Sequence, residues 1–206
     1  MNQTIAVSGT GTASAPPTLA VVDIGVEVVD SSVATARAAA ATDMAAVVAS
    51  LRESGVADTR ISTITYTINP EYDHGAGRRF VGYRVVNTVA AQIEDIDAVG
   101  DILDAATGAG GEHVVVRALR FQHQDPAGLE AEARTHAWDD TRNKARQLAE
   151  LAGVVLGRVV AISEQPHQGG GPVPLRAMAV AAAGGAPIET GELAVTVSIH
   201  AEFEID

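Results

Sequence analysis

The chain has 206 residues, of which 47% are hydrophobic and only 3% aromatic, so its core must be built from alanine, valine, isoleucine and leucine. With 14 basic against 26 acidic residues the formal net charge is −12, which repels polyanions and argues against nucleic acid as a partner. The absence of cysteine excludes disulfides, thiol catalysis and cysteine-ligated metals.

The sequence offers no run of apolar residues long enough to cross a bilayer. Its first residues lack the basic and apolar regions of a signal peptide. We therefore expect a soluble chain without a transmembrane segment. As the sequence stands it is expected in the cytoplasm, and in the periplasm or outside the cell if a leader peptide has been removed.

The first half of the chain alternates between strand and helix patterns. Strands are predicted at residues 5–13, 18–29, 61–68 and 80–94, and in the third of these Ile64, Tyr66 and Ile68 are predicted to face inward. Residues 30–32 offer N-cap side chains for a helix with an apolar stripe, which Gly55 ends. Residues 69–77 are rich in turn formers and predict a hairpin tip.

The second half continues the pattern. A helix is predicted from about residue 96 to Gly108, followed by a strand at 114–121. Asp125 and Pro126 supply an N-cap and a first-turn proline for a third helix, which ends at Gly153. Strands at 158–164 and 193–205 complete the chain, and the last one has an apolar residue at every second position.

This order predicts a single α+β domain over residues 1–206. Strand–helix–strand units recur at 18–68, 80–121 and, more loosely, 129–164. Such an order is typical of a largely antiparallel sheet with about three helices packed on one face. The final strand has to enter the sheet, so we expect the two ends of the chain to meet in it.

Residues 165–191 form an arm rich in Gly, Pro and Ala that fits no predicted strand or helix. A connection this long is either a surface loop or a segment used in binding or assembly. Leu175, Met178 and Val180 have no obvious place in the core. Together with Arg176 they are our candidates for an assembly or interaction site.

Signals for catalysis or nucleotide binding are incomplete. Gly9 and Gly11 resemble the start of a dinucleotide-binding motif, but two prolines follow where its helix should begin. The chain has no Gly-x-Ser-x-Gly motif, and Ser8, Ser14 and Ser163 have no histidine near them in sequence. The missing motif makes a hydrolase less expected, but residues distant in sequence could still form a triad.

Polar clusters also favour structural roles. Glu132 and His136 share a face of the third predicted helix, with Asp139 and Asp140 beyond, but no second histidine pair completes a metal site. The group Tyr72, Asp73 and His74 is typical of a polar turn. Asn87 lies on the apolar face of its strand, where a buried amide is expected to hold a bulge or a neighbouring loop by hydrogen bonds.

Segments along the whole chain resemble the SIMPL-domain family, also called the domain of unknown function 541. The matching segments are residues 7–13, 55–63, 80–89, 133–134, 144–145, 148–149, 153–157, Glu164 and 187–192. The resemblance implies an α+β fold, bacterial relatives exported to the periplasm, and one relative that forms a ring-like oligomer. It also implies relatives in oxidative-stress protection and an animal adaptor in kinase signalling. It implies no catalytic residues.

We therefore expect a non-enzymatic, self-assembling protein that acts through oligomeric or partner-binding surfaces. No cofactor, metal or catalytic residue is expected. One alternative is a small-molecule-binding protein or enzyme with a pocket between helices and sheet, where Tyr66, Tyr83 and His74 would be tested first. A second alternative is a protein-interaction adaptor in signalling.

Overall fold

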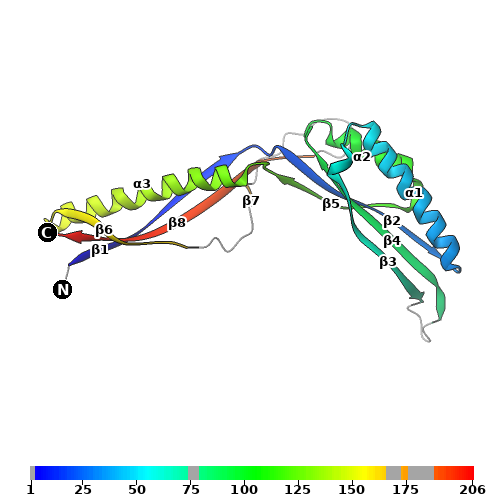
Figure 1. Cartoon of the computed structure of the whole chain (residues 1–206), viewed down its shortest axis with the longest axis horizontal. Coiled ribbons are helices and arrows are strands. Elements are labelled where there is room, and N and C mark those ends of the chain that lie inside the picture. The colour runs from blue at the N-terminus through cyan, green and yellow to red at the C-terminus, as the bar shows by residue number, and fades with distance from the viewer. Residues whose placement is uncertain (1–2, 74–78, 166–172, 176–187) are drawn as a thin grey trace. The chain divides into compact units, whose positions relative to one another are not determined.

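Figure 1 shows a computed structural model of the chain, which describes residues 3–73, 79–165, 173–175 and 188–206. The chain divides into two compact units. Unit 1 contains the described residues of 1–17, 123–180 and 189–206, and unit 2 those of 18–122 and 181–188. Each unit has an antiparallel sheet of its own, so the α+β class with antiparallel sheets is confirmed.

Unit 1 joins the two ends of the chain in one sheet. Its strands are β1 (Thr4–Ala15), β6 (Leu156–Gln165), β7 (Val173–Leu175) and β8 (Glu192–Ile205). They lie in the order β1-β8-β6, with β7 also paired to β8. Residues 4–15 of β1 pair with residues 204–193 of β8 without a break in register, which confirms that the chain ends meet in a sheet.

Helix α3 (Pro126–Ala152) packs on one face of this sheet, along β1 and β8 (Figure 1). The side chain of Asp125 accepts a hydrogen bond from the Gly128 N–H, and Gly153 ends the helix in a left-handed conformation with φ of 71°. Both ends of α3 are therefore where the sequence predicts them. Alternate residues of β8 meet small residues of α3 in the core: Ala133, Ala137, Val195, Val197 and Ile199.

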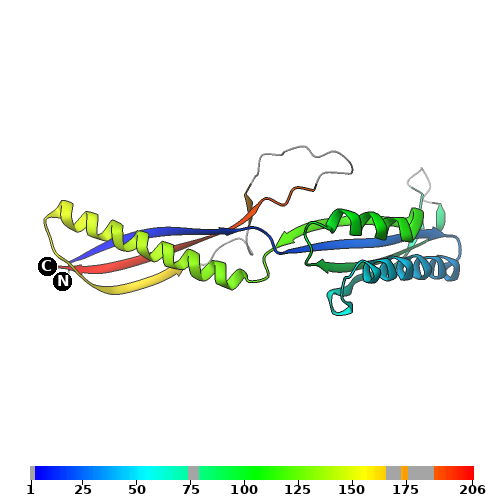
Figure 2. The same ribbon diagram turned by 90° about the horizontal axis from the view of Figure 1, so that it is seen from above.

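Unit 2 is a four-stranded sheet with two helices. Its strands are β2 (Leu19–Asp30), β3 (Ile61–Tyr72), β4 (Phe80–Ile93) and β5 (Val114–Gln122), in the order β3-β4-β2-β5. Helices α1 (Val33–Glu53) and α2 (Val99–Gly110) run side by side along the sheet (Figure 2). Short 3-10 turns, η1 (Asp58–Arg60) and η2 (Gly111–His113), precede β3 and β5.

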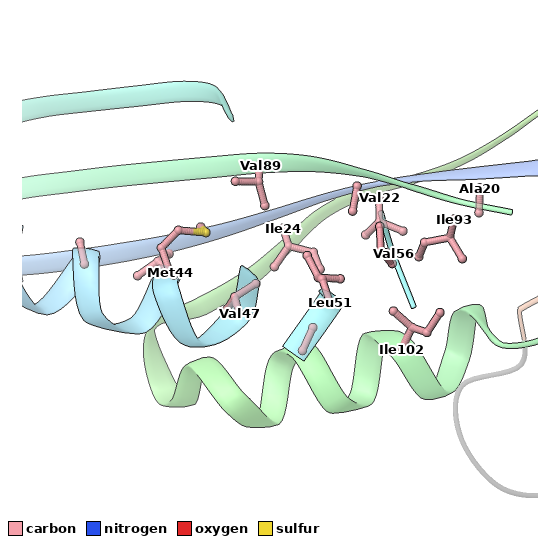
Figure 3. Packing of buried hydrophobic residues seen from close by; sticks show 14 of the residues in the cluster. Ala20, Val22, Ile24, Met44, Val47, Leu51, Val56, Val89, Ile93 and Ile102 are labelled. Carbon is pink, nitrogen blue, oxygen red and sulfur yellow. The ribbon is translucent and has the colours of Figure 1, made fainter. Parts of the chain in front are cut away.

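The core of unit 2 lies between the helices and the two middle strands (Figure 3). Every second residue of β2 points toward the helices, and the apolar stripe of α1 covers them. The buried residues labelled there are Ala20, Val22, Ile24, Met44, Val47, Leu51, Val56, Val89, Ile93 and Ile102. These are small or aliphatic, as the composition requires.

The predicted inward direction of three β3 side chains is wrong. Ile64, Tyr66 and Ile68 are 50%, 52% and 37% exposed. Helix α1 packs mainly on β2 and β4, so the outermost strand β3 lies beside the helix layer rather than under it. The pairing of β3 with β4 also shifts between Thr63 and Thr65, which places a bulge at Ile64.

Candidate functional site

The outer edge of β1 is closed by three polar side chains of helix α3. Asp140 accepts a hydrogen bond from the Thr10 N–H at 2.9 Å, and the Nδ1–H of His136 donates to the Thr12 carbonyl at 2.9 Å. Lys144 donates to the Ser8 carbonyl at 3.2 Å. Three side chains spaced four residues apart thus take the place of a neighbouring strand.

Two glycines allow this close packing. A Cβ atom at Gly9 would clash with the backbone of Ala137 and Thr141, and one at Gly11 with the backbone of Ala133 and Ala137. The pair that resembles a dinucleotide-binding motif therefore serves helix–strand packing. The lysine and the Thr10 N–H also lower the pKa of Asp140, with the lysine hydrogen bond as the larger cause.

Strand β6, at the other edge of the same sheet, is open. Among the described residues no strand pairs with its outer side. All its residues after Leu156 are exposed, including Val160 at 43% and Ile162 at 59%. Helix α3 covers β1 and β8 but barely reaches β6, so this strand has both a free backbone edge and uncovered aliphatic side chains.

A pocket of about 350 Å³ lies between α3 and β6, and its lining is mainly apolar. Trp138 and Arg134 come from α3, Ile162, Ser163 and Glu164 from β6, and Ile199 from β8. The Trp138 ring is stacked on Phe203 with centroids 6.2 Å apart, which fixes its position at the pocket wall. A volume of this size is at the lower end of ligand pockets.

An ion pair connects the two sides of this pocket. Arg134 donates from Nε and Nη2 to the two carboxylate oxygens of Glu164, at 2.6 and 2.9 Å. The hydrogen bond from Arg134 lowers the pKa of Glu164 below its usual range. The guanidinium thus has a fixed orientation, and Nη1 is not used in this pair.

Unit 2 has an open edge of its own at β3. Its residues from Ser62 to Pro70 are all exposed, and β4 is the only strand that pairs with it in the described part of the chain. Tyr72 and Phe80 continue the apolar surface at the end of the hairpin, with ring centroids 5.8 Å apart. We call Ile64, Tyr66, Ile68, Tyr72 and Phe80 the β3 strip.

The face of the unit 2 sheet opposite the helices carries paired charges. Arg84 binds both Glu71 and Glu27, and Glu27 also accepts from Arg117, so the chain of ion pairs crosses all four strands. Beside this chain, Arg120 donates to both carboxylate oxygens of Asp23, at 2.8 and 3.0 Å. Each of these arginines has a carboxylate partner, which does not suit a nucleic-acid surface.

The structure brings together one pair of reactive residues that are distant in sequence. The Ser8 hydroxyl lies 3.1 Å from Nδ1 of His200 across β1 and β8. Thr12 and Thr196 form a similar contact at 3.0 Å on the same strands. No described carboxylate is recorded as a hydrogen-bond partner of the other His200 nitrogen, so the pair fits a polar cross-strand contact better than a catalytic triad.

Of the other predicted site residues, Asn87 lies on β4 opposite Val26 and Tyr66. Its side-chain oxygen is buried and accepts no hydrogen bond from any described residue. Leu175 is the last residue of β7. Three further candidates, Arg176, Met178 and Val180, and the turn residue His74 lie outside the described residues.

Neither a metal centre nor a membrane-spanning helix is found in the described part of the chain. No three His, Asp or Glu side chains there are placed to hold a metal ion. None of the helices described is both long and apolar enough to traverse a bilayer.

Sequence reasoning missed the pocket between α3 and β6. A single tryptophan in a chain so poor in aromatic residues was an available signal, because such residues often mark a functional surface. The exposure of Ile162 could not be found in the same way, because alternation in a strand does not tell which of its faces a helix covers.

Comparisons with known proteins find similarity along nearly the whole chain. The profile of the SIMPL family, described as protein of unknown function (DUF541), matches residues 5–203 and so runs through both units. The 26 kDa periplasmic immunogenic protein of Brucella melitensis is 30% identical over 219 positions, covering 98% of this chain and 84% of the relative. The uncharacterized protein YggE of Escherichia coli K12 is 30% identical over 159 positions, covering 77% of this chain and 64% of the relative.

Proposed function

This chain belongs to the SIMPL family, and from that premise we propose that it is a non-enzymatic protein that associates with copies of itself through the β3 strip. The observation that carries the proposal is the exposure of β3 on both faces together with its unpaired edge in the described structure. Apolar, aromatic side chains at such an edge favour pairing with another strand.

The geometry of β3 is suited to a symmetric pair. Residues 65–69 pair regularly with β4, so their backbone is extended after the bulge. If two copies pair antiparallel about Thr67, Tyr66 of each copy lies opposite Ile68 of the other. Such a contact is self-complementary, as a two-fold interface requires.

Sedimentation of the whole chain tests this proposal. We expect wild type to associate at micromolar concentration and Ile68→Lys to remain monomeric, because a charge on a strand edge opposes pairing. Val115→Lys is the matched control, since Val115 is 40% exposed on β5 at the other edge of the same sheet. A monomeric wild type, or equal effects of the two substitutions, would contradict the proposal.

The relatives suggest where this association would take place. Because the Brucella relative is named as a periplasmic protein, we propose the periplasm for this chain as well, which cell fractionation with a cytoplasmic marker would test. Protection against oxidative stress stays a prediction from the family resemblance. The chain has no cysteine, so such a role would not use a thiol of its own.

A further inference from the structure

We propose that the pocket between α3 and β6 binds an extended peptide that carries a carboxylate, with the peptide added as a strand to the outer edge of β6. This site lies in unit 1, whereas the β3 strip belongs to unit 2. Peptide binding here is therefore a property separate from the self-association proposed above. The partner is therefore a segment of another protein that ends in, or contains, an acidic group next to an apolar side chain.

The two edges of the unit 1 sheet differ in whether they can accept another strand. At β1, Asp140, His136 and Lys144 bind the backbone groups that face away from β8. At β6 the described structure places no strand on the corresponding side. An edge that is closed cannot accept a strand, whereas an open edge offers its N–H and C=O groups to an extended peptide.

The pocket lies beside that edge and can take a side chain of the added strand. In an added strand every second side chain points to the α3 face of the sheet. There it meets Ile162, which is 59% exposed, and the wall formed by Trp138 and Ile199. The pocket volume of about 350 Å³ has room for an aliphatic side chain. Backbone pairing and a side-chain pocket together are the elements of peptide recognition by strand addition.

Arg134 indicates the charge of the partner. Glu164 holds Arg134 through Nε and Nη2, which leaves the two donors of Nη1 without a recorded partner among the described residues. Arginine binds carboxylates through such planar donors. A carboxylate of the peptide can therefore join Arg134 on the side that Glu164 does not occupy.

These features favour a peptide over two other occupants. An acyl chain with a carboxylate would fill the pocket and reach Arg134, but it would make no use of the open backbone edge. A second copy of this chain would meet the same repulsion between net charges of −12 that opposes association through the β3 strip, and β6 has no aromatic side chain to offset it. Both occupants remain distinguishable outcomes of the experiment below.

The test uses the whole chain and the emission of Trp138, which is its only tryptophan. The probe is an N-acetylated hexapeptide of alternating threonine and valine with a free C-terminal carboxylate, titrated at fixed protein concentration. We expect a saturable change in emission. The C-terminal amide of the same peptide should bind about tenfold more weakly, because it lacks the charged hydrogen bond to Arg134. Two further versions are N-methylated at alternate residues. The version whose methyl groups replace the N–H groups that face β6 should not bind, whereas the version methylated at the other residues should still bind.

Two variants and a control locate the site. Arg134→Gln should lower the affinity for the acid to that for the amide while both peptides still bind, a result that a loss of folding would not produce. Ile162→Ser should weaken the acid peptide. Leu151→Ser is the control because Leu151 is 85% exposed on α3 and does not line the pocket; it should bind the peptide like wild type.

Several results would overturn the proposal. One is equal affinity for acid and amide in wild type, and another is binding that N-methylation leaves unchanged. Saturable binding of lauric acid that Arg134→Gln abolishes, with no response to any peptide, would assign the pocket to a lipid-like ligand. Concentration-dependent dimers that Ile162→Ser removes would assign it to a second copy. Failure of β3-mediated association would affect none of these results.

Discussion

At the scale of single residues, Gly9 and Gly11 set the distance between β1 and α3. Both lie under the helix backbone, and their missing side chains let His136, Asp140 and Lys144 reach the edge of β1. Packing and edge closure thus depend on the same two positions. In the sequence these glycines resemble part of a dinucleotide-binding motif. The pattern Gly-x-Gly indicates that another group packs closely against the backbone, but it does not tell whether that group is a ligand or, as here, a helix.

The first prediction concerns this close packing. Gly11→Ala should destabilise the protein by about 1–3 kcal/mol, because the added Cβ forces α3 away from β1. Gly108→Ala in helix α2 is the control, since a Cβ there meets nothing within 4 Å; it should stabilise by about 0.5–1 kcal/mol. Urea denaturation of both variants measures the free energy of unfolding. If Gly11→Ala leaves the free energy of unfolding unchanged, α3 does not pack closely on β1 at this position.

The second prediction concerns pH and Asp140. Because its pKa is lowered in the folded protein, the folded state binds fewer protons than the unfolded state at low pH. The carboxylate therefore contributes stability above about pH 4, its unfolded pKa. That contribution is lost as the pH falls through the lower, folded value. Asp140→Asn should reduce stability at neutral pH and flatten the loss of stability below about pH 4.

Denaturation midpoints as a function of pH test this expectation. Asn retains an oxygen that can accept from the Thr10 N–H, so the variant removes the charge rather than the hydrogen bond. Asp139→Asn is the matched control, because it removes one negative charge from the same helix. If the Asp140→Asn and wild-type profiles run parallel in acid, the interaction with Lys144 carries no net stabilisation.

At the scale of elements, periodicity and capping predicted most of the fold. The final strand β8 alternates as expected, with Leu193, Val195 and Val197 buried. The ends of α3 were found because Asp125 and Gly153 have local roles that do not depend on tertiary contacts. The prediction that the apolar side chains of β3 face inward was wrong, because their exposure depends on where α1 lies in space. The pocket at Trp138 depends in the same way on the reach of α3.

The third prediction concerns the start of α3. Asp125→Ala should cost about 1 kcal/mol, because the Gly128 N–H loses the acceptor that it now has at 2.8 Å. Asp125→Asn, which keeps a capping oxygen, should retain most of the stability. Denaturation of unit 1 can be followed by Trp138 emission, since this residue lies on α3. Equal effects of the alanine and asparagine variants would argue that the cap is not used.

At the scale of the whole molecule, charge opposes the association that the β3 strip favours. Each copy carries a formal net charge of −12, so copies repel one another at low salt. The fourth prediction is that the association constant of the wild type rises with salt concentration, because counterions screen this repulsion. Sedimentation at low and high sodium chloride measures it. Association that weakens with salt would instead indicate an interface held by ion pairs.

The pairing of β1 with β8 has a consequence for the order of folding during synthesis. Nearly all of unit 2 lies within residues 18–122, so it can fold once that part of the chain has left the ribosome. The sheet of unit 1 has β8 at its centre, and β8 ends at Ile205. Until β8 has been synthesised, β1 lacks the strand with which it pairs. A ribosome stalled after residue 190 would therefore hold a chain in which unit 2 is folded and unit 1 still lacks its central strand.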